Sequence, residues 1–238
     1  MSETARRITA HQANHLPYPG FFAKMDMVDQ FVILDDVQFV KGEYHNRNRI
    51  RLNAEAHWLT VPVIHSGRQG QCIADVEIDN RRDWRGTHLR TLQQNYSSAP
   101  HFDSYFPPFA ELYGQPWERL IDFNLALIRG LAAALGISTP CCLSSGLQIS
   151  GTVTDRLIDI CAATGATEFV HGKHACDYVD FDKMSAAGIA NEIQSYTAVE
   201  YPQTGPDFVA DLAAVDVLLN CGPRSCDVVL AGNTLQNA

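Results

Sequence analysis

The order of the elements expected in residues 7–36 restricts the fold of this chain more than any other feature. Arg7–Ala10 is short and partly β-branched, which predicts a strand. Phe21–Val28 carries apolar side chains at helical spacing, and Phe31–Leu34 is a continuous apolar run that is typical of a strand buried on both faces. A strand, a helix and a buried strand in this order predict a parallel βαβ unit with a right-handed crossover.

Polar side chains follow both predicted strands. His11, Gln12 and His15 come after the first strand, and Asp35 and Asp36 end the second. Because ligands of parallel α/β sheets bind beyond the carboxyl ends of the strands, we expect both clusters to face one crevice. Neighbouring residues of a strand point to opposite faces, so at most one of the two aspartates faces the ligand, and the pattern does not say which.

A polar segment follows, and it allows two interpretations. Lys41, Asn46, Arg47, Asn48 and Arg49 lie within nine residues, and guanidinium and amide groups are suited to binding phosphate or carboxylate. The segment is therefore predicted to bind substrate. Alternatively it is a solvated loop, or a strand on which the two asparagines share one side and the two arginines the other.

The remaining segments are assigned as follows. Trp58–Val63 and Ile73–Ile78 are expected to form a β-hairpin. Asp83 is expected to cap a helix that runs to about Tyr96, Ala99–Phe109 to form a loop, and Pro116 to open a long helix that Gly136 ends. The further strands predicted are Cys141–Leu143, Glu168–His171 and an edge strand at Ile193–Tyr196, and the further helices are Thr152–Thr164 and Leu212–Leu219.

These elements predict an α/β fold with a Rossmann-like, mainly parallel sheet flanked by helices. We expect a single domain over residues 1–238, with a β-hairpin and helical insertion at about 54–138. The turn Gly172-Lys173-His174 directly follows a predicted strand. It is either a second anion-binding turn, in which Lys173 binds substrate, or a plain surface turn.

The charge and the cysteines limit the partners and the compartment. Asp and Glu outnumber Lys and Arg by 27 to 18, so no broad cationic surface for DNA is expected, and a tRNA partner is disfavoured. No run of eighteen apolar residues and no apolar leader segment are present, which predicts no membrane contact. Seven cysteines without a CxxC pair indicate reduced thiols in the cytoplasm and no metal site.

Several ordered motifs of the chain resemble one known family. They are HQ-xx-HLP-xx-GFFAKM, FVILDDVQF-x-K, NRNRI, WLTVPV and a late Asp216…Asn220-x-Gly222 segment. This string resembles the WbqC-like proteins, which occur among bacterial genes for surface polysaccharide (O-antigen) and in natural-product clusters. The resemblance implies a biosynthetic acyl- or aminoacyl-transferring role, and glycine transfer to an amino sugar has been suggested for members.

The expected activity is therefore a transferase that forms an amide on an amine acceptor, an amino sugar or a natural-product intermediate. The catalytic candidates are His11, Asp35, Asp36 and Lys41, and the substrate-binding candidates are Gln12, His15, Asn46, Arg47, Asn48, Arg49, Lys173 and Asn220. No cofactor is assigned. The candidate donors are a coenzyme A thioester, the thioester of an acyl carrier protein, and an aminoacyl donor.

Two other classes of function stay open at this point. A strand, a histidine-rich loop, a helix and a strand also open the nucleotide-dependent ligases and nucleotidyltransferases of the HIGH type, although His11 and His15 are not at the spacing of that motif. A shared fold does not fix a function. The third alternative is a non-catalytic binding protein in a biosynthetic complex.

Overall fold

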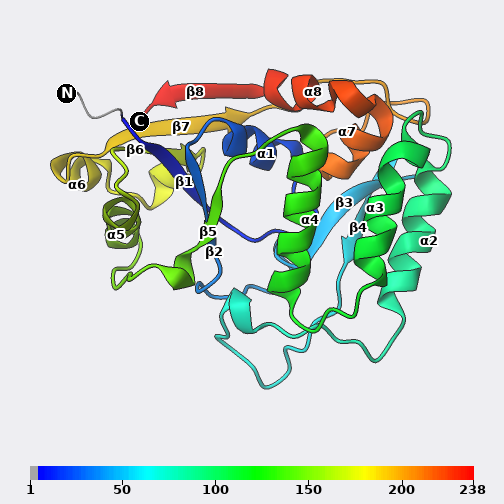
Figure 1. Ribbon diagram of the computed structural model, residues 1–238, viewed down its shortest axis with the longest axis horizontal. Coiled ribbons are helices and arrows are strands. Elements are labelled where there is room, and N and C mark those ends of the chain that lie inside the picture. Colours follow the sequence, from blue (N-terminus) through cyan, green and yellow to red (C-terminus); the bar gives the residue numbers. More distant parts are fainter. Residues whose placement is uncertain (1–4) are drawn as a thin grey trace.

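A six-stranded sheet forms the centre of the computed structural model, which describes residues 5–238 (Figure 1). The strand order is β5-β2-β1-β6-β7-β8, and every neighbouring pair is parallel except β7 with β8. This confirms the predicted mainly parallel α/β fold. The strands are β1 (Arg7–Gln12), β2 (Gln30–Leu34), β5 (Cys141–Leu143), β6 (Glu168–Gly172), β7 (Ala190–Tyr196) and β8 (Asn233–Asn237).

The first βαβ unit forms as the sequence predicts. Helix α1 (Pro19–Asp26) connects β1 to β2, and the two strands pair in parallel with Ala10 opposite Val32. Proline fits the first helical position, because that residue has no intrahelical partner for an N–H group. β2 is apolar on both faces, since both faces of the sheet are covered.

Alternate residues of β2 enter two different cores. Phe31 and Ile33 belong to the larger core, together with side chains of α1, α4 (Leu120–Leu135), α7 (Ala214–Cys221) and α8 (Ser225–Ala231). Val32 enters a smaller core with side chains of α5 (Thr154–Thr164) and α6 (Phe181–Ala186). Figure 1 shows α5 and α6 at one end of the sheet and α7 and α8 near the other. Because alternate residues of β2 enter these two cores, helices cover both faces of the sheet, as a parallel sheet requires.

The chain between β2 and β5 forms a hairpin and further helices beside the sheet (Figure 1). The predicted pairing of Trp58–Val63 with Ile73–Ile78 is wrong except for one isolated bridge between Val63 and Ile78. The hairpin instead joins β3 (Arg47–Leu52) to β4 (Glu55–Thr60). Its turn residues, Asn53 and Ala54, have φ of 50° and 67°. β3 reads RNRIRL, a polar strand without the apolar pattern on which the prediction relied.

The predicted loop Ala99–Phe109 is also wrong, because most of it lies in helix α3 (Phe102–Gly114). Phe102, Phe106 and Phe109 recur at helical spacing and are buried, so their packing maintains the helix in spite of two internal prolines. The helix predicted from Pro116 begins only at Leu120, while α2 (Trp84–Tyr96) begins at the Asp83 cap as expected.

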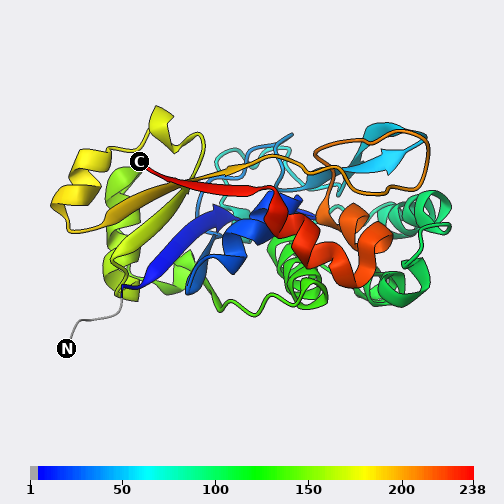
Figure 2. The same cartoon turned by 90° about the horizontal axis from the view of Figure 1, so that it is seen from above.

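β7 is not an edge strand, because β8 pairs with it in antiparallel orientation. In the view from above, β8 runs along β7 (Figure 2), and it returns the C-terminus to the end of the sheet at which α5 and α6 lie (Figure 1). The C-terminal residues NTLQN of β8 had no strand assigned from the sequence. In the described part of the chain, no helix has the length and the hydrophobicity needed to span a membrane.

A buried carboxylate holds the long segment between β7 and α7. Asp216 accepts hydrogen bonds from the hydroxyls of Tyr96 and Tyr201, each at 2.7 Å, and from the Gln203 amide at 3.0 Å. Arg51 donates to Gln203 and to the carbonyl of Asp207. These contacts fix the segment that carries Asp211 to the hairpin.

Candidate functional site

A cavity of about 650 Å³ opens where the strand order of the sheet reverses. From β1 the chain proceeds outward to β2 and β5, then crosses back to place β6 and β7 on the other side of β1. Such a switch point leaves a crevice beyond the carboxyl ends of the two central strands. The cavity is lined there by His11 and Gln12 of β1, by Gly172 of β6 and by Gln194 and Tyr196 of β7.

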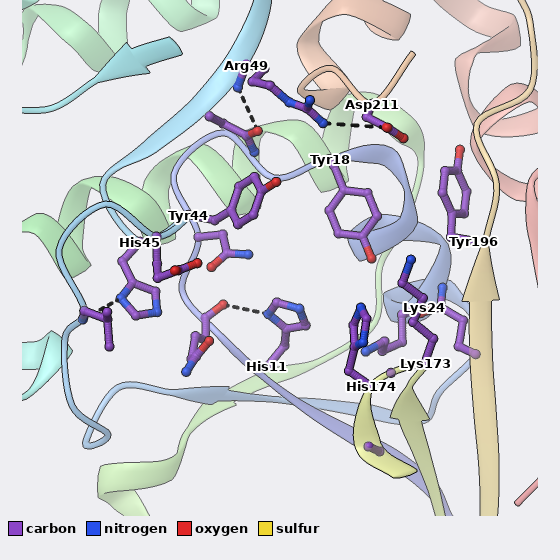
Figure 3. A pocket seen from close by; sticks show the side chains of 18 of the residues that line it. His11, Tyr18, Lys24, Tyr44, His45, Arg49, Lys173, His174, Tyr196 and Asp211 are labelled. Atoms are coloured by element: carbon purple, nitrogen blue, oxygen red, sulfur yellow. Dashed lines mark hydrogen bonds and ion pairs between the residues drawn. The ribbon is translucent and has the colours of Figure 1, made fainter. Parts of the chain in front are cut away.

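Figure 3 shows two groups of side chains on the cavity walls. His11, Lys24, Lys173 and His174 gather at one end, next to the carboxyl ends of β1 and β6. The other lining residues come from the segment between β1 and α1, the segment before the hairpin, the hairpin itself and the segment after β7. They include Tyr18, Glu43, Tyr44, His45, Arg49 and Asp211.

Lys24 is the most unusual residue of the site. It projects from the buried face of α1, and only 4% of the residue is exposed. Its ammonium group has no hydrogen bond or ion pair with any residue of the described chain, and burial lowers its pKa to about 8. Charged groups with so little exposure are almost always paired in proteins. The missing partner of Lys24 is therefore expected to be a ligand anion in the cavity.

His11 presents a free ring nitrogen in the same region. Its Nδ1 lies 3.0 Å from the carbonyl oxygen of Gln12, and because a carbonyl only accepts, the proton is assigned to Nδ1. Nε2 then carries a lone pair and has no partner among residues 5–238. Burial and the nearby Lys24 ammonium lower the pKa of His11 to about 3, so the imidazole is neutral at pH 7. A neutral imidazole with a fixed tautomer presents Nε2 as an acceptor to a substrate, and an anion paired with Lys24 would remove one cause of the low pKa and so make Nε2 a stronger base.

Aromatic hydroxyls line the cavity between its two ends. The rings of Tyr18 and Tyr196 are in edge contact, with centroids 5.9 Å apart, and the Tyr18 hydroxyl points toward His11 and Lys24 (Figure 3). Burial raises the pKa of each phenol to about 12, which keeps both as O–H donors. Arg49 lies 3.7 Å from Asp211 and so joins β3 to the segment after β7.

Five of the predicted site residues line the cavity: His11, Gln12, Asn48, Arg49 and Lys173. The amide nitrogen of Asn48 donates to the carbonyl of Leu16 at 2.7 Å. That bond ties β3 to the segment before α1, so Asn48 has a structural contact as well as a place in the cavity wall. The turn at Lys173 and His174, which the sequence could not distinguish from a plain surface turn, contributes both of its side chains to the cavity.

Asp35 and Asp36 do not line the cavity, contrary to the expectation of one shared crevice. Asp35 is buried and accepts hydrogen bonds from the backbone N–H and the hydroxyl of Ser145, at 2.9 and 2.6 Å. Asp36 forms an ion pair with Arg156. Burial raises its pKa, but the hydrogen bonds that it accepts from Ser144 and Arg156 outweigh burial and leave the pKa below its usual value. The crevice lies on the β6 side of β1, whereas both aspartates follow β2 on its other side.

The other predicted residues also lie away from the cavity. His15 is fully buried, with its Nδ1 3.3 Å from the Asn124 amide oxygen, and burial lowers its pKa to about 3. Asn46 donates to the carbonyl of Val61 at 2.8 Å, and Asn220 donates to the carbonyl of Asp216. These three side chains bind the protein's own backbone and side chains.

Arg47 and Lys41 are the remaining predicted site residues that do not line the cavity. The Arg47 guanidinium lies over the Trp58 ring, 4.1 Å from its centroid, and Lys41 is exposed. The alternation considered for β3 is the one observed, because Asn46 and Asn48 are buried while Arg47 and Arg49 lie on the other face.

The sequence interpretation missed most of the cavity wall. Tyr18, Lys24, Tyr44, His45, Tyr196 and Asp211 were not proposed. Lys24 had a detectable signal, since it is the one cation in the apolar helical stretch Phe21–Val28. The others come from segments whose approach to β1 is visible only in the fold. Within residues 5–238, no cluster of three or more His, Cys, Asp or Glu side chains could hold a metal ion.

Comparison with known proteins gives a family and one uncharacterised relative. A family model described as the WbqC-like protein family matches residues 12–228. A Mycobacterium tuberculosis (strain ATCC 25618 / H37Rv) protein described as the uncharacterized protein Rv1507c is 34% identical over 226 residues, which cover 93% of this chain and 96% of the relative. No solved structure shows a significant match.

Proposed function

Because the chain belongs to the WbqC-like protein family, we propose that it is a transferase that forms an amide by moving an acyl or aminoacyl group from an activated donor to an amine. The observation that supports this most is His11, a neutral imidazole with a free Nε2 in a cavity at the switch point of the sheet. An amine that attacks a carbonyl must lose a proton, and a positioned imidazole can accept it.

The reaction is written here for a thioester donor. The amine nitrogen attacks the thioester carbonyl carbon, and the new C–N bond forms while a proton passes to Nε2 of His11. The tetrahedral intermediate then collapses, the C–S bond breaks, and the proton leaves with the thiolate. The neutral Tyr18 hydroxyl points into this end of the cavity and is suited to donate to the oxygen that becomes negative (Figure 3).

The opposite end of the cavity is suited to an amine acceptor. Glu43 and Asp211 supply carboxylates in the cavity wall, and a protonated amine is attracted to such groups before it reacts. The donor is a thioester on coenzyme A or on an acyl carrier protein, or an aminoacyl donor. The acceptor is an amino sugar or an amine intermediate of a biosynthetic route.

A mass assay tests this function. The protein is incubated with candidate amines and an acyl thioester, and parallel reactions contain ATP and a free acid. We expect amide product from the thioester without ATP, and none from the His11→Gln variant. His57→Gln is a matched control, because His57 is exposed on β4 and outside the cavity. Amide formation only with ATP, or equal turnover by His11→Gln and the wild type, would contradict the proposal.

A further inference from the structure

The unpaired Lys24 ammonium marks one end of the cavity as an anion subsite. Lys24 is 4% exposed, and its Nζ lies against the end of β6, since a Cβ placed on Gly172 would be 3.4 Å from it. The two residues that follow, Lys173 and His174, are exposed and line the same cavity. Figure 3 shows these three side chains at the same end of the cavity. The chain carries a net charge of -9, so two lysines beside one end of a cavity are a local concentration of positive charge in an acidic protein.

The carboxylates in the cavity wall do not neutralise this end. Asp211 lies near Arg49, on the wall opposite Lys24 (Figure 3). Asp177 approaches Nδ1 of His174 at 3.7 Å, but that pair is largely exposed. Glu43 is the other carboxylate of the cavity wall, and among the described residues none of these three acids forms a hydrogen bond or ion pair with Lys24 or Lys173. A ligand with more than one negative charge would therefore be attracted to this end of the cavity. Its attraction to the Lys24 ammonium would be screened by water less than its attraction to the exposed Lys173.

The start of α1 shows why side chains must bind the anion. In many parallel α/β proteins a glycine-rich turn and the first helical N–H groups hold a phosphate. Here α1 begins with Pro19, which has no N–H, and the rings of Tyr18 and Tyr196 crowd Gly20, where a Cβ would meet them at 2.4 and 2.6 Å. Lys24, in the last turn of the same helix, instead places its ammonium group against Gly172 at the end of β6 and lines the same cavity.

We infer that Lys24, Lys173 and His174 bind the diphosphate of a substrate. Two ammonium groups and an imidazole suit the several oxygens of a phosphate as point charges, whereas recognition of a lone carboxylate favours a bidentate arginine. The cavity of about 650 Å³ holds a ligand of cofactor size. The inference rests on the proposed function in one respect, namely that the bound diphosphate belongs to a partner in the transfer.

A diphosphate can reach this subsite from two sources. It is part of a coenzyme A thioester, which would be the donor, and of a nucleotide-activated amino sugar, which would be the acceptor. Both present the same group to Lys24, so the binding experiment includes both. Titration of the full chain by calorimetry with inorganic pyrophosphate, coenzyme A and uridine diphosphate measures binding without requiring turnover.

Three variants test the assignment. Lys24→Met removes the buried charge at similar length, Lys173→Gln removes the exposed one, and Lys183→Gln removes a lysine of α6 that lies outside the cavity. We expect pyrophosphate to bind the wild type and Lys183→Gln equally, and Lys24→Met at least about tenfold more weakly, which is the loss expected for one charge-assisted hydrogen bond. Circular dichroism checks that each variant is folded, and Lys173→Gln, an exposed change, gives a second measure of the same loss.

Each outcome decides the inference independently of the transferase assay. Tighter binding of coenzyme A than of pyrophosphate, lost in Lys24→Met, supports a diphosphate donor, and tighter binding of uridine diphosphate supports a diphosphate acceptor. Failure of all three ligands to bind the wild type, or equal pyrophosphate binding by the wild type and Lys24→Met, would overturn the subsite. Amide formation without diphosphate binding would leave the proposed function standing and this inference refuted.

Discussion

The buried ammonium of Lys24 should make the folded protein less stable, and the substitution Lys24→Met should recover that loss. Burial lowers the pKa of Lys24 from 10.5 to about 8. Each pKa unit corresponds to about 1.4 kcal/mol, so the charged side chain costs the folded state about 3 kcal/mol at pH 7. Methionine has a similar length and no charge, and it tolerates irregular surroundings. Lys24→Met should therefore raise the free energy of unfolding at pH 7 by about 3 kcal/mol.

The pH dependence of this gain identifies its cause. The folded-state pKa is the lower one, so between pH 8 and 10.5 the unfolded chain binds more protons at this side chain than the folded protein does. The wild type is thereby stabilised relative to the variant as the pH rises through that window. The advantage of Lys24→Met should shrink to about 1 kcal/mol at pH 10, because Lys24 of the folded protein is by then neutral and only the half unit that remains below the unfolded pKa of 10.5 still favours the unfolded chain.

Urea denaturation followed by tryptophan fluorescence measures both values. Comparison of the two proteins at each pH cancels the titration of groups that Lys24 does not contact. Lys183→Gln serves as the control, because its ammonium is half exposed and pairs with Asp155. A variant that is less stable than the wild type at pH 7, or an advantage that does not diminish between pH 7 and pH 10, would refute the reasoning. Loss of pyrophosphate binding in the same stabilised variant would show that the charge is kept for a ligand.

Three further predictions concern residues inside and outside the cavity. Burial lowers the pKa of His11 to about 3, so kcat/KM of the wild type should show no acid limb from this imidazole near pH 6.5, and a limb at that pH that His57→Gln retains would contradict a neutral base. Asp35→Asn should lower the free energy of unfolding by about 1–3 kcal/mol, because it weakens the hydrogen bonds from Ser145, and it should change turnover little. A large loss of turnover at unchanged stability would instead indicate that Asp35 takes part in the reaction. Burial lowers the pKa of His88 from 6.5 to about 4, so the unfolded chain binds the proton more tightly and the folded protein loses stability as the pH falls from 6.5 to 4. In His88→Phe the free energy of unfolding, measured by urea denaturation, should fall less steeply over that range, by up to about 1.4 kcal/mol per pH unit. Equal slopes in the two proteins would contradict this prediction.

The elements that were predicted correctly are those whose apolar pattern is local. β1, α1 and β2 follow from short-range periodicity, and so does α5 with its Gly165 cap, which has φ of 68°. β3 stayed one of several alternatives for its segment, because its stability comes from contacts that no local pattern shows, such as the bond from Asn48 to Leu16. α3 was missed because its prolines outweighed four buried aromatic residues at helical spacing.

The candidate site shows the same division between local and distant information. His11 could be predicted because it follows β1 directly. The choice between β2 and β6 as its neighbour across the crevice could not, because it depends on the strand order of the whole sheet. The aspartates that follow β2 were therefore placed in the cavity, while Tyr196 and Asp211 were left out. Sequence alone gives the end of a strand, but only the assembled sheet shows which other ends lie beside it.

The pairing of β1 with β6 has a consequence for how the protein folds during synthesis. The Thr9 hydroxyl donates to the carbonyl of Val170 at a sequence separation of 161, so the two central strands meet only after most of the chain has left the ribosome. Contacts of such long sequence separation form slowly, and until then one side of β1 is an open strand edge. Truncated chains that end before β6 should accordingly depend on chaperones and aggregate when those are limiting, because they have β1 and β2 but nothing to close the sheet.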